Sequence, residues 1–150
     1  MKRFKSLILT ILFVMFISLN ASANKYTMNA TWYKPGHGCG WVTASGDRIN
    51  YNKLKNFQIR WVALSPDMFN KHGFKMGDVI EIESEYKELS GIWIVKDKTS
   101  LKLKNHIDFL FAQQPETFGS GKVKMRKKKH NEKVVTDTVD YKVKKAFGLI

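Results

Sequence analysis

The chain has 150 residues and a formal net charge of +13, from 26 Lys or Arg and 13 Asp or Glu. This length allows one domain with a hydrophobic core, and a single cysteine, Cys39, excludes an internal disulfide. Residues 122–150 contain ten basic and three acidic side chains, whereas residues 24–121 contain 13 and 10. The basic end is suited to an anionic wall polymer or a membrane surface, or it is a solvated tail. Neither specific nucleic-acid binding nor an oligomer is expected.

The first 23 residues have the pattern of a secretory signal. Three basic residues precede an apolar run at positions 7–19, and Ala21-Ser22-Ala23 is a cleavage site of small residues. The apolar run of about 13 residues is shorter than the roughly 20 that a spanning helix needs. We therefore expect cleavage after Ala23 and a secreted or periplasmic protein.

The mature part predicts short strands separated by turns. Alternating or apolar runs predict strands at Tyr26–Tyr33, Gln58–Leu64, Val79–Ser84, Gly91–Lys96, Ile107–Phe111 and Lys122–Arg126. Residues 41–45 are expected to be extended, and residues 34–40 and 49–56 are expected to be loops. No predicted helix is long enough for a crossover. The pattern predicts an all-β fold, a small closed barrel over residues 24–126, followed by a basic tail over 127–150 with a further strand near Val134.

Only single-turn helices are expected. Ser65 and Pro66 are a cap and a first helical residue, and the helix they begin should end by Gly73. Another turn is predicted at Pro115–Phe118, and residues 98–105 have room for one more.

Two aspartates lie in apolar surroundings, eleven positions apart. Asp97 follows the run Ile92–Val95, and Asp108 lies between Ile107 and Phe109. Burying a lone carboxylate is costly unless it is paired or protonated. One interpretation is that Asp97 caps a short helix and Asp108 pairs with a lysine. The other is that both acids share a cleft, where desolvation and mutual repulsion raise one pKa and create a general acid.

The order of short segments resembles the double-psi β-barrel domains that act on cell-wall glycans. The residues that carry the resemblance are Ala30–Tyr33, Thr43–Gly46, Ala63–Pro66, Met76–Ile80, Asp97, Ile107–Asp108, Phe118–Gly119 and Val123–Met125. The sequence is most similar to the three-aspartate domain and the barrel of membrane-bound lytic transglycosylase A. Rare lipoprotein A and the expansins resemble it more distantly. The resemblance covers about residues 26–126 and implies a six-stranded double-psi barrel.

The resemblance also implies roles for the two acids. Asp108, in the segment His106-Ile107-Asp108, matches the catalytic acid of the transglycosylase, and Asp97 matches the acid that shapes the charge of the site. Two features depart from the family pattern: Ser65 stands where a third aspartate is usual, with Asp67 two positions later, and Lys98 begins a segment that is usually small and glycine-rich. We expect no second domain of the kind that completes the transglycosylase groove.

Two functions follow as alternatives. A lytic transglycosylase cleaves the MurNAc–GlcNAc linkage of peptidoglycan with one acid, because the C6 hydroxyl of muramic acid is the nucleophile; Asp108 would be that acid, with help from Asp97. The alternative is a non-catalytic, expansin-like module that binds peptidoglycan or another polysaccharide. The expected sugar-contacting residues are Trp32, Tyr33, Trp41, Thr43, Ser45 and His106, with Thr43 a candidate hydrogen-bond partner of Asp108.

Cys39 allows two further interpretations. It could act as a nucleophile with His37 or His106 as its base. A zinc site of His37, Cys39 and His72 fits no standard ligand spacing. An unpaired thiol is the simpler expectation, so neither a metal nor a cofactor is predicted.

Overall fold

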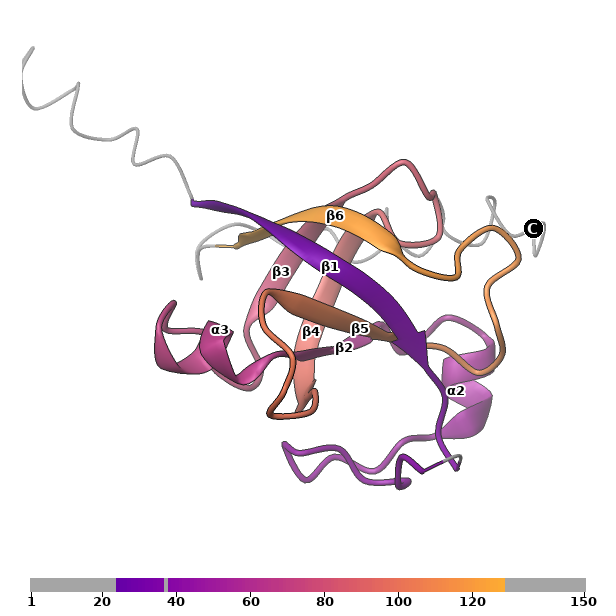
Figure 1. The fold of residues 1–150 in the computed structure, drawn as a ribbon. Helices are drawn as coiled ribbons and strands as arrows, with labels where there is room; N and C mark the ends of the chain where they lie inside the picture. The colour runs from indigo at the N-terminus through magenta and orange to yellow at the C-terminus, as the bar shows by residue number, and fades with distance from the viewer. Residues whose placement is uncertain (1–23, 37, 129–150) are drawn as a thin grey trace, which may run out of the picture.

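The structure is a computed structural model that describes residues 24–36 and 38–128. Six strands close into one barrel in the order β1-β5-β2-β4-β3-β6 (Figure 1). This confirms the predicted all-β class and the small closed barrel. The strands are β1 (Lys25–Tyr33), β2 (Trp61–Leu64), β3 (Val79–Glu83), β4 (Gly91–Lys98), β5 (His106–Leu110) and β6 (Gly121–Lys127).

The ring contains both parallel and antiparallel strand pairs. The β1/β5 and β2/β4 pairs are parallel, and the other four pairs are antiparallel. The consequence for function is that β2 lies between β4 and β5, the strands that carry the two aspartates. Residues far apart in the sequence therefore meet on one wall of the barrel.

The barrel interior is apolar because apolar side chains occupy the inward positions of the strands. The inward residues, nearly all of them inaccessible to solvent, are Met28, Ala30, Val62, Leu64, Ile80, Ile82, Trp93, Val95, Ile107, Phe109, Val123 and Met125. Trp93 and Phe109 meet edge to face, with ring centroids 4.8 Å apart. Phe118, from the segment before β6, packs against Phe109 at 6.3 Å. Close-packed aromatic rings fill the interior, so any binding site has to lie on the outer surface.

One of the two helices was predicted. Helix α3 (Pro66–Asn70) follows Ser65 as expected. Helix α2 (Tyr51–Lys55) occupies a segment that was predicted to be a loop, and that prediction is wrong. The side chain of Asn50 accepts a hydrogen bond of 3.0 Å from the amide of Lys53, and the side chain of Leu54 is buried. The capping bond and the buried leucine stabilise this helix, although the polar composition of the segment had predicted a loop.

The remaining single turns are not helical. Residues 115–118 contain bends, and residues 99–105 contain only a turn. The expected signal segment, the expected strand near Val134 and all of the basic tail beyond Lys128 lie outside the described residues. Within the described ranges, no helix is long and apolar enough to cross a membrane.

Candidate functional site

The pairing of β2 with both neighbours places the two aspartates on one wall. Ala63 of β2 is opposite Asp97 of β4 on one side and opposite Asp108 of β5 on the other. Thr31 of β1 is opposite Asp108. Paired residues point to the same face of a sheet, and neighbouring strands lie about 4.8 Å apart, so the Cα atoms of the two acids are about 10 Å apart. The row Thr31–Asp108–Ala63–Asp97 thus crosses the outer wall, with a small alanine between the acids.

Asp108 is half-buried and contacts two side chains. Its Oδ1 accepts a hydrogen bond from the Thr31 hydroxyl and lies 3.2 Å from Nε2 of His106, while the Thr31 oxygen is 2.8 Å from the same nitrogen. The side chain of Asp108 is 21% exposed. Burial raises the pKa of the Asp108 carboxyl above its ordinary value; His106 opposes this rise and Asp97 adds to it. The carboxyl group therefore retains its proton to higher pH than a free aspartate does.

Asp97 faces outward because of a β-bulge. Val62 is opposite Val95, and the next residue, Ala63, is opposite Asp97, so Lys96 is the extra residue on β4. Strict alternation with Trp93 and Val95 would turn Asp97 toward the core. The bulge turns it outward instead.

Three donors hold the Asp97 carboxyl. Its Oδ1 accepts from the amides of Ala44 and Lys98, each at 2.9 Å. Its Oδ2 accepts from the Tyr33 hydroxyl at 3.2 Å. These bonds fix the carboxyl in place and tie the loop that contains Ala44 to the barrel wall. The interpretation of Asp97 as a helix cap is wrong, because no helix follows it.

Tyr33 and Cys39 lie within electrostatic reach of both acids. The pKa of the Tyr33 phenol is raised, mainly by burial and next by the charge of Asp97, so the hydroxyl remains a hydrogen-bond donor. The pKa of the Cys39 thiol is also raised, mainly by burial and next by the charges of Asp97 and Asp108. A nucleophilic cysteine needs the opposite shift, toward the thiolate. The environment of Cys39 therefore disfavours the nucleophile interpretation, and its candidate base His37 lies outside the described residues.

Thr43 and Ser45 form a polar loop beside Asp97 instead of contacting Asp108. The Thr43 hydroxyl lies 3.0 Å from that of Ser45, which donates to Asp47 at 2.6 Å. Lys96 also binds Asp47, at 2.8 Å. The predicted bond between Thr43 and Asp108 is wrong, because Thr31 takes that place. Thr31 was missed, although its position two residues before Tyr33 on an alternating strand places both side chains on one face.

Ser65 and Asp67 support the site indirectly, by hydrogen bonds to the backbone at the start of β5. The Ser65 hydroxyl accepts from the amide of His106 at 2.9 Å, and the amide of Ser65 donates to the His106 carbonyl at 3.0 Å. Asp67 accepts from the amide of Asn105 at 3.1 Å. Ser65 thus fixes the start of β5, and with it the histidine beside Asp108.

Two exposed aromatic side chains meet beside the loop that is bonded to Asp97: Trp41 lies on this loop, and Tyr51 is the first residue of α2. Trp41 and Tyr51 are each 44% exposed, and their rings meet edge to face with centroids 6.2 Å apart. Trp32, also an expected sugar contact, packs against the barrel core instead, on the opposite face of β1 from Thr31 and Tyr33. The exposed rings available for stacking on a sugar are therefore Trp41 and Tyr51.

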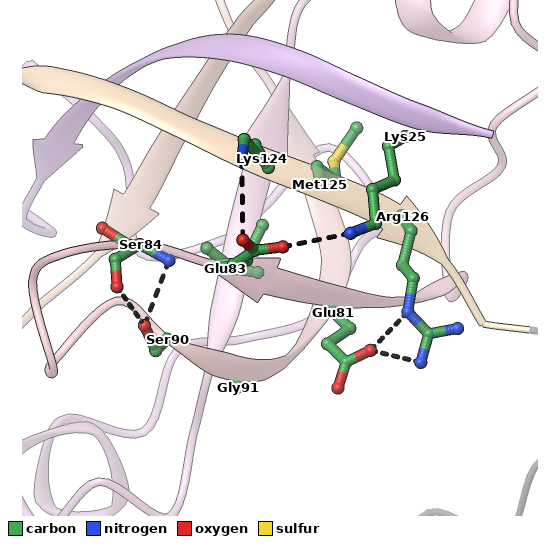
Figure 2. A pocket seen from close by; sticks show the side chains of 10 residues that line it. Lys25, Glu81, Glu83, Ser84, Ser90, Gly91, Lys124, Met125 and Arg126 are labelled. Atoms are coloured by element: carbon green, nitrogen blue, oxygen red, sulfur yellow. Dashed lines mark hydrogen bonds and ion pairs between the residues drawn. The ribbon is translucent and has the colours of Figure 1, made fainter. Parts of the chain in front are cut away.

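The opposite wall has a pocket of about 360 Å³ between β3, β4 and β6. Figure 2 shows that its charged side chains pair with one another: Lys25 and Lys124 with Glu83, and Arg126 with Glu81. These charges satisfy each other, and none of the predicted site residues lines this pocket.

The structure gives no support to a zinc site that joins Cys39 to His72, and the third candidate ligand, His37, lies outside the described residues. His72 packs on Tyr26, with ring centroids 5.0 Å apart, near the start of β1. Cys39 follows the end of β1, which is about 23 Å away at the rise of a strand. Among the residues that the structure describes, no group of three or more metal-binding side chains comes together.

No protein-family model and no curated protein matches the sequence. Among solved structures, an expansin from Clavibacter michiganensis is similar, with 13% identity over 71% of this chain and a TM-score of 0.50. The chain spans about half of that expansin, 52% of its length. A variant of this expansin in complex with cellohexaose has 13% identity, coverage of 71% and 51%, and a TM-score of 0.49. A Streptomyces papain inhibitor has 16% identity, coverage of 71% and 96%, and a TM-score of 0.49.

At such identities the likeness concerns the fold alone: the chain has an expansin-like β-barrel. It agrees with the part of the sequence resemblance that pointed to the expansins. The finer assignment, to the three-aspartate or lytic transglycosylase type, receives no support from it.

Proposed function

We propose that the chain is an exported cell-wall module that binds polysaccharide on the outer wall around Asp97 and Asp108. The observation that carries this proposal is the exposed pair Trp41 and Tyr51: Trp41 lies on the loop whose Ala44 amide is bonded to Asp97, and Tyr51 begins helix α2. Sugars are recognised by aromatic faces that stack on the ring and by polar groups that bind its hydroxyls. The expansin-like barrel supports the same class of function.

The distance along the loop fits one extended ligand. Trp41 and Ala44 are three residues apart, so their Cα atoms are at most about 11 Å apart. A glycan stacked on Trp41 and Tyr51 would therefore extend its next rings toward Asp97 and across Ala63 to Asp108. Peptidoglycan, whose strands carry hydroxyl, amide and carboxyl groups, is the proposed polymer.

The proposal is tested by sedimentation of the protein with insoluble peptidoglycan and with cellulose. Trp41→Ala and Tyr51→Ala should each weaken binding about tenfold, since each removes apolar surface worth about 1.5 kcal/mol when a sugar covers it. Lys87→Ala, an exposed change on the segment between β3 and β4, is the matched control and should bind normally. Unchanged binding by both aromatic variants would contradict the proposed surface.

A second function, lytic transglycosylation, is favoured by the state of Asp108. A half-buried carboxyl with a raised pKa is suited to protonate the glycosidic oxygen as the C1–O bond breaks. The C6 hydroxyl of the muramic residue then bonds to C1 and returns its proton to Asp108, so no water is consumed. Asp97 is less suited to act as a second carboxylate, because protein donors occupy both of its oxygens. Ordinary hydrolysis, which needs two working carboxyls, is therefore disfavoured.

Mass spectrometry of peptidoglycan digests separates the two functions. A transglycosylase releases 1,6-anhydro products, lighter by one water than hydrolysis products, and Asp108→Asn should abolish them. Binding without any released product, by both proteins, would establish the non-catalytic module.

A further inference from the structure

The segment that joins β4 to β5 is strongly basic and carries an exposed leucine. We call residues 98–105 the lysine loop; it contains Lys98, Lys102 and Lys104, all exposed, and no acidic residue. Leu101, between them, is 86% exposed, the highest value among the large hydrophobic side chains that the structure describes. Single exposed leucines are common on proteins, but a leucine at a basic loop tip combines two features that one partner can use.

The loop is held at both ends, so its tip is presented in one conformation. The amide of Thr99 donates to the Leu64 carbonyl at 3.0 Å. At the other end, the amide of Asn105 donates to the Asp67 carboxylate at 3.1 Å. Between these anchors, the amide of Leu103 donates to the Ser100 carbonyl at 3.1 Å, which closes a tight turn. Leu101 and Lys102 occupy the two central positions of that turn and point away from the barrel.

The charge of the loop is available to a partner. Lys98 lies over the ring of Phe69, 5.1 Å from its centroid, and keeps its ammonium group exposed. Across the described part of the chain, no ion pair engages Lys98, Lys102 or Lys104, whereas the lysines of the opposite wall pair with Glu83. The loop therefore offers three positive charges around one apolar side chain.

We propose that the lysine loop docks onto a membrane surface rich in anionic lipids, with Leu101 inserted below the headgroups and the lysines beside the lipid phosphates. Basic residues near an anionic leaflet and a buried apolar side chain are the two terms that bind peripheral proteins to membranes. An anionic wall polymer would use the lysines equally well, but it gives no account of the exposed leucine. The loop connects the two strands that carry Asp97 and Asp108, so docking would hold the acid-bearing wall near the bilayer. This proposal does not depend on the glycan function.

Vesicle sedimentation of residues 24–150, the expected mature chain with its basic tail, tests the proposal, because the tail then contributes equally to every variant and the apolar run at positions 7–19 is absent. Binding is measured with vesicles of mixed phosphatidylglycerol and phosphatidylcholine and with pure phosphatidylcholine. The triple variant Lys98→Gln, Lys102→Gln, Lys104→Gln should weaken binding to the anionic vesicles about 100-fold, roughly fivefold per lysine. The triple variant Lys53→Gln, Lys55→Gln, Lys87→Gln removes the same charge from other exposed positions and should retain most of the binding.

The leucine separates a membrane from any other anionic partner. Leu101→Ser should lower vesicle binding about tenfold without changing the net charge. Equal loss in the two triple variants would overturn the proposal, as would an unaffected Leu101→Ser variant. Weakened sedimentation with peptidoglycan, together with unchanged vesicle binding in the loop variant, would assign the loop to a wall polymer instead. Thermal unfolding at the wild-type temperature verifies that each variant is folded.

Discussion

Replacing Asp108 by Asn removes a carboxyl whose pKa burial holds above its ordinary value. A group with a raised pKa binds its proton more tightly in the folded chain than in the unfolded one. The folded state therefore loses stability as pH rises through that pKa. We expect Asp108→Asn to lack this loss, so its free energy of unfolding should exceed that of the wild type at neutral pH but not in acid. Urea unfolding of both proteins between about pH 3 and pH 7 measures the difference.

Asp47→Asn is the control, because the pKa of Asp47 is shifted in the opposite direction to that of Asp108. Hydrogen bonds from Lys96 and Ser45 hold the pKa of its carboxyl below the usual range. The stability that Asp47 contributes is present above the unfolded pKa and disappears as pH falls through the folded value. Asp47→Asn should therefore be less stable than the wild type at neutral pH and equal to it in strong acid. If both variants changed in the same direction with pH, the assignment of a raised pKa to Asp108 would be wrong.

At the scale of single elements, Lys96 is the extra residue of the bulge in β4. Deleting Lys96 removes the extra residue and places Asp97 directly after Val95, still opposite Ala63 and facing outward but without the bulge. The deletion also removes the Lys96 carbonyl, which accepts a hydrogen bond of 3.0 Å from the Ser45 amide. We expect the deletion variant to fold and to lose about 2 kcal/mol of its free energy of unfolding, measured with urea. Lys96→Ala keeps the bulge and this backbone bond and removes the ion pair with Asp47, which costs less than about 1 kcal/mol. Equal stability of the two variants would show that the bulge adds nothing to stability beyond the ion pair.

Strand β4 also contains the feature that the sequence could not predict, the bulge that turns Asp97 outward. Asp108 lies between Ile107 and Phe109, both inward, so alternation alone places it outside. Asp97 follows Trp93 and Val95 at even spacing, so the same rule places it inside, and only the pairing register reveals the bulge. Closed-barrel architecture followed from many short alternating strands. The partners of the acids did not, because contacts such as that between Thr31 and Asp108 join strands distant in sequence.

At the scale of the whole molecule, the barrel closes without the basic end of the chain. Within the residues that the structure describes, the last barrel contact of the main chain is the bond from the Lys128 amide to the Val79 carbonyl, at 2.9 Å. A chain that ends after Lys128 keeps all six strands, so its free energy of unfolding should change by less than about 1 kcal/mol. The same truncation removes five basic and three acidic side chains from the tail (residues 129–150), together with His130. Retention on anionic peptidoglycan should therefore become weaker and less sensitive to salt, while retention on neutral cellulose should not change.

Measuring retention at several salt concentrations separates the tail from the acid-bearing wall. Trp41→Ala should weaken binding to both polymers at every salt concentration, because stacking on a sugar does not depend on net charge. The truncation should act on the anionic polymer alone and most strongly at low salt. A truncated chain that lost its cooperative unfolding would instead make the tail part of the folded domain.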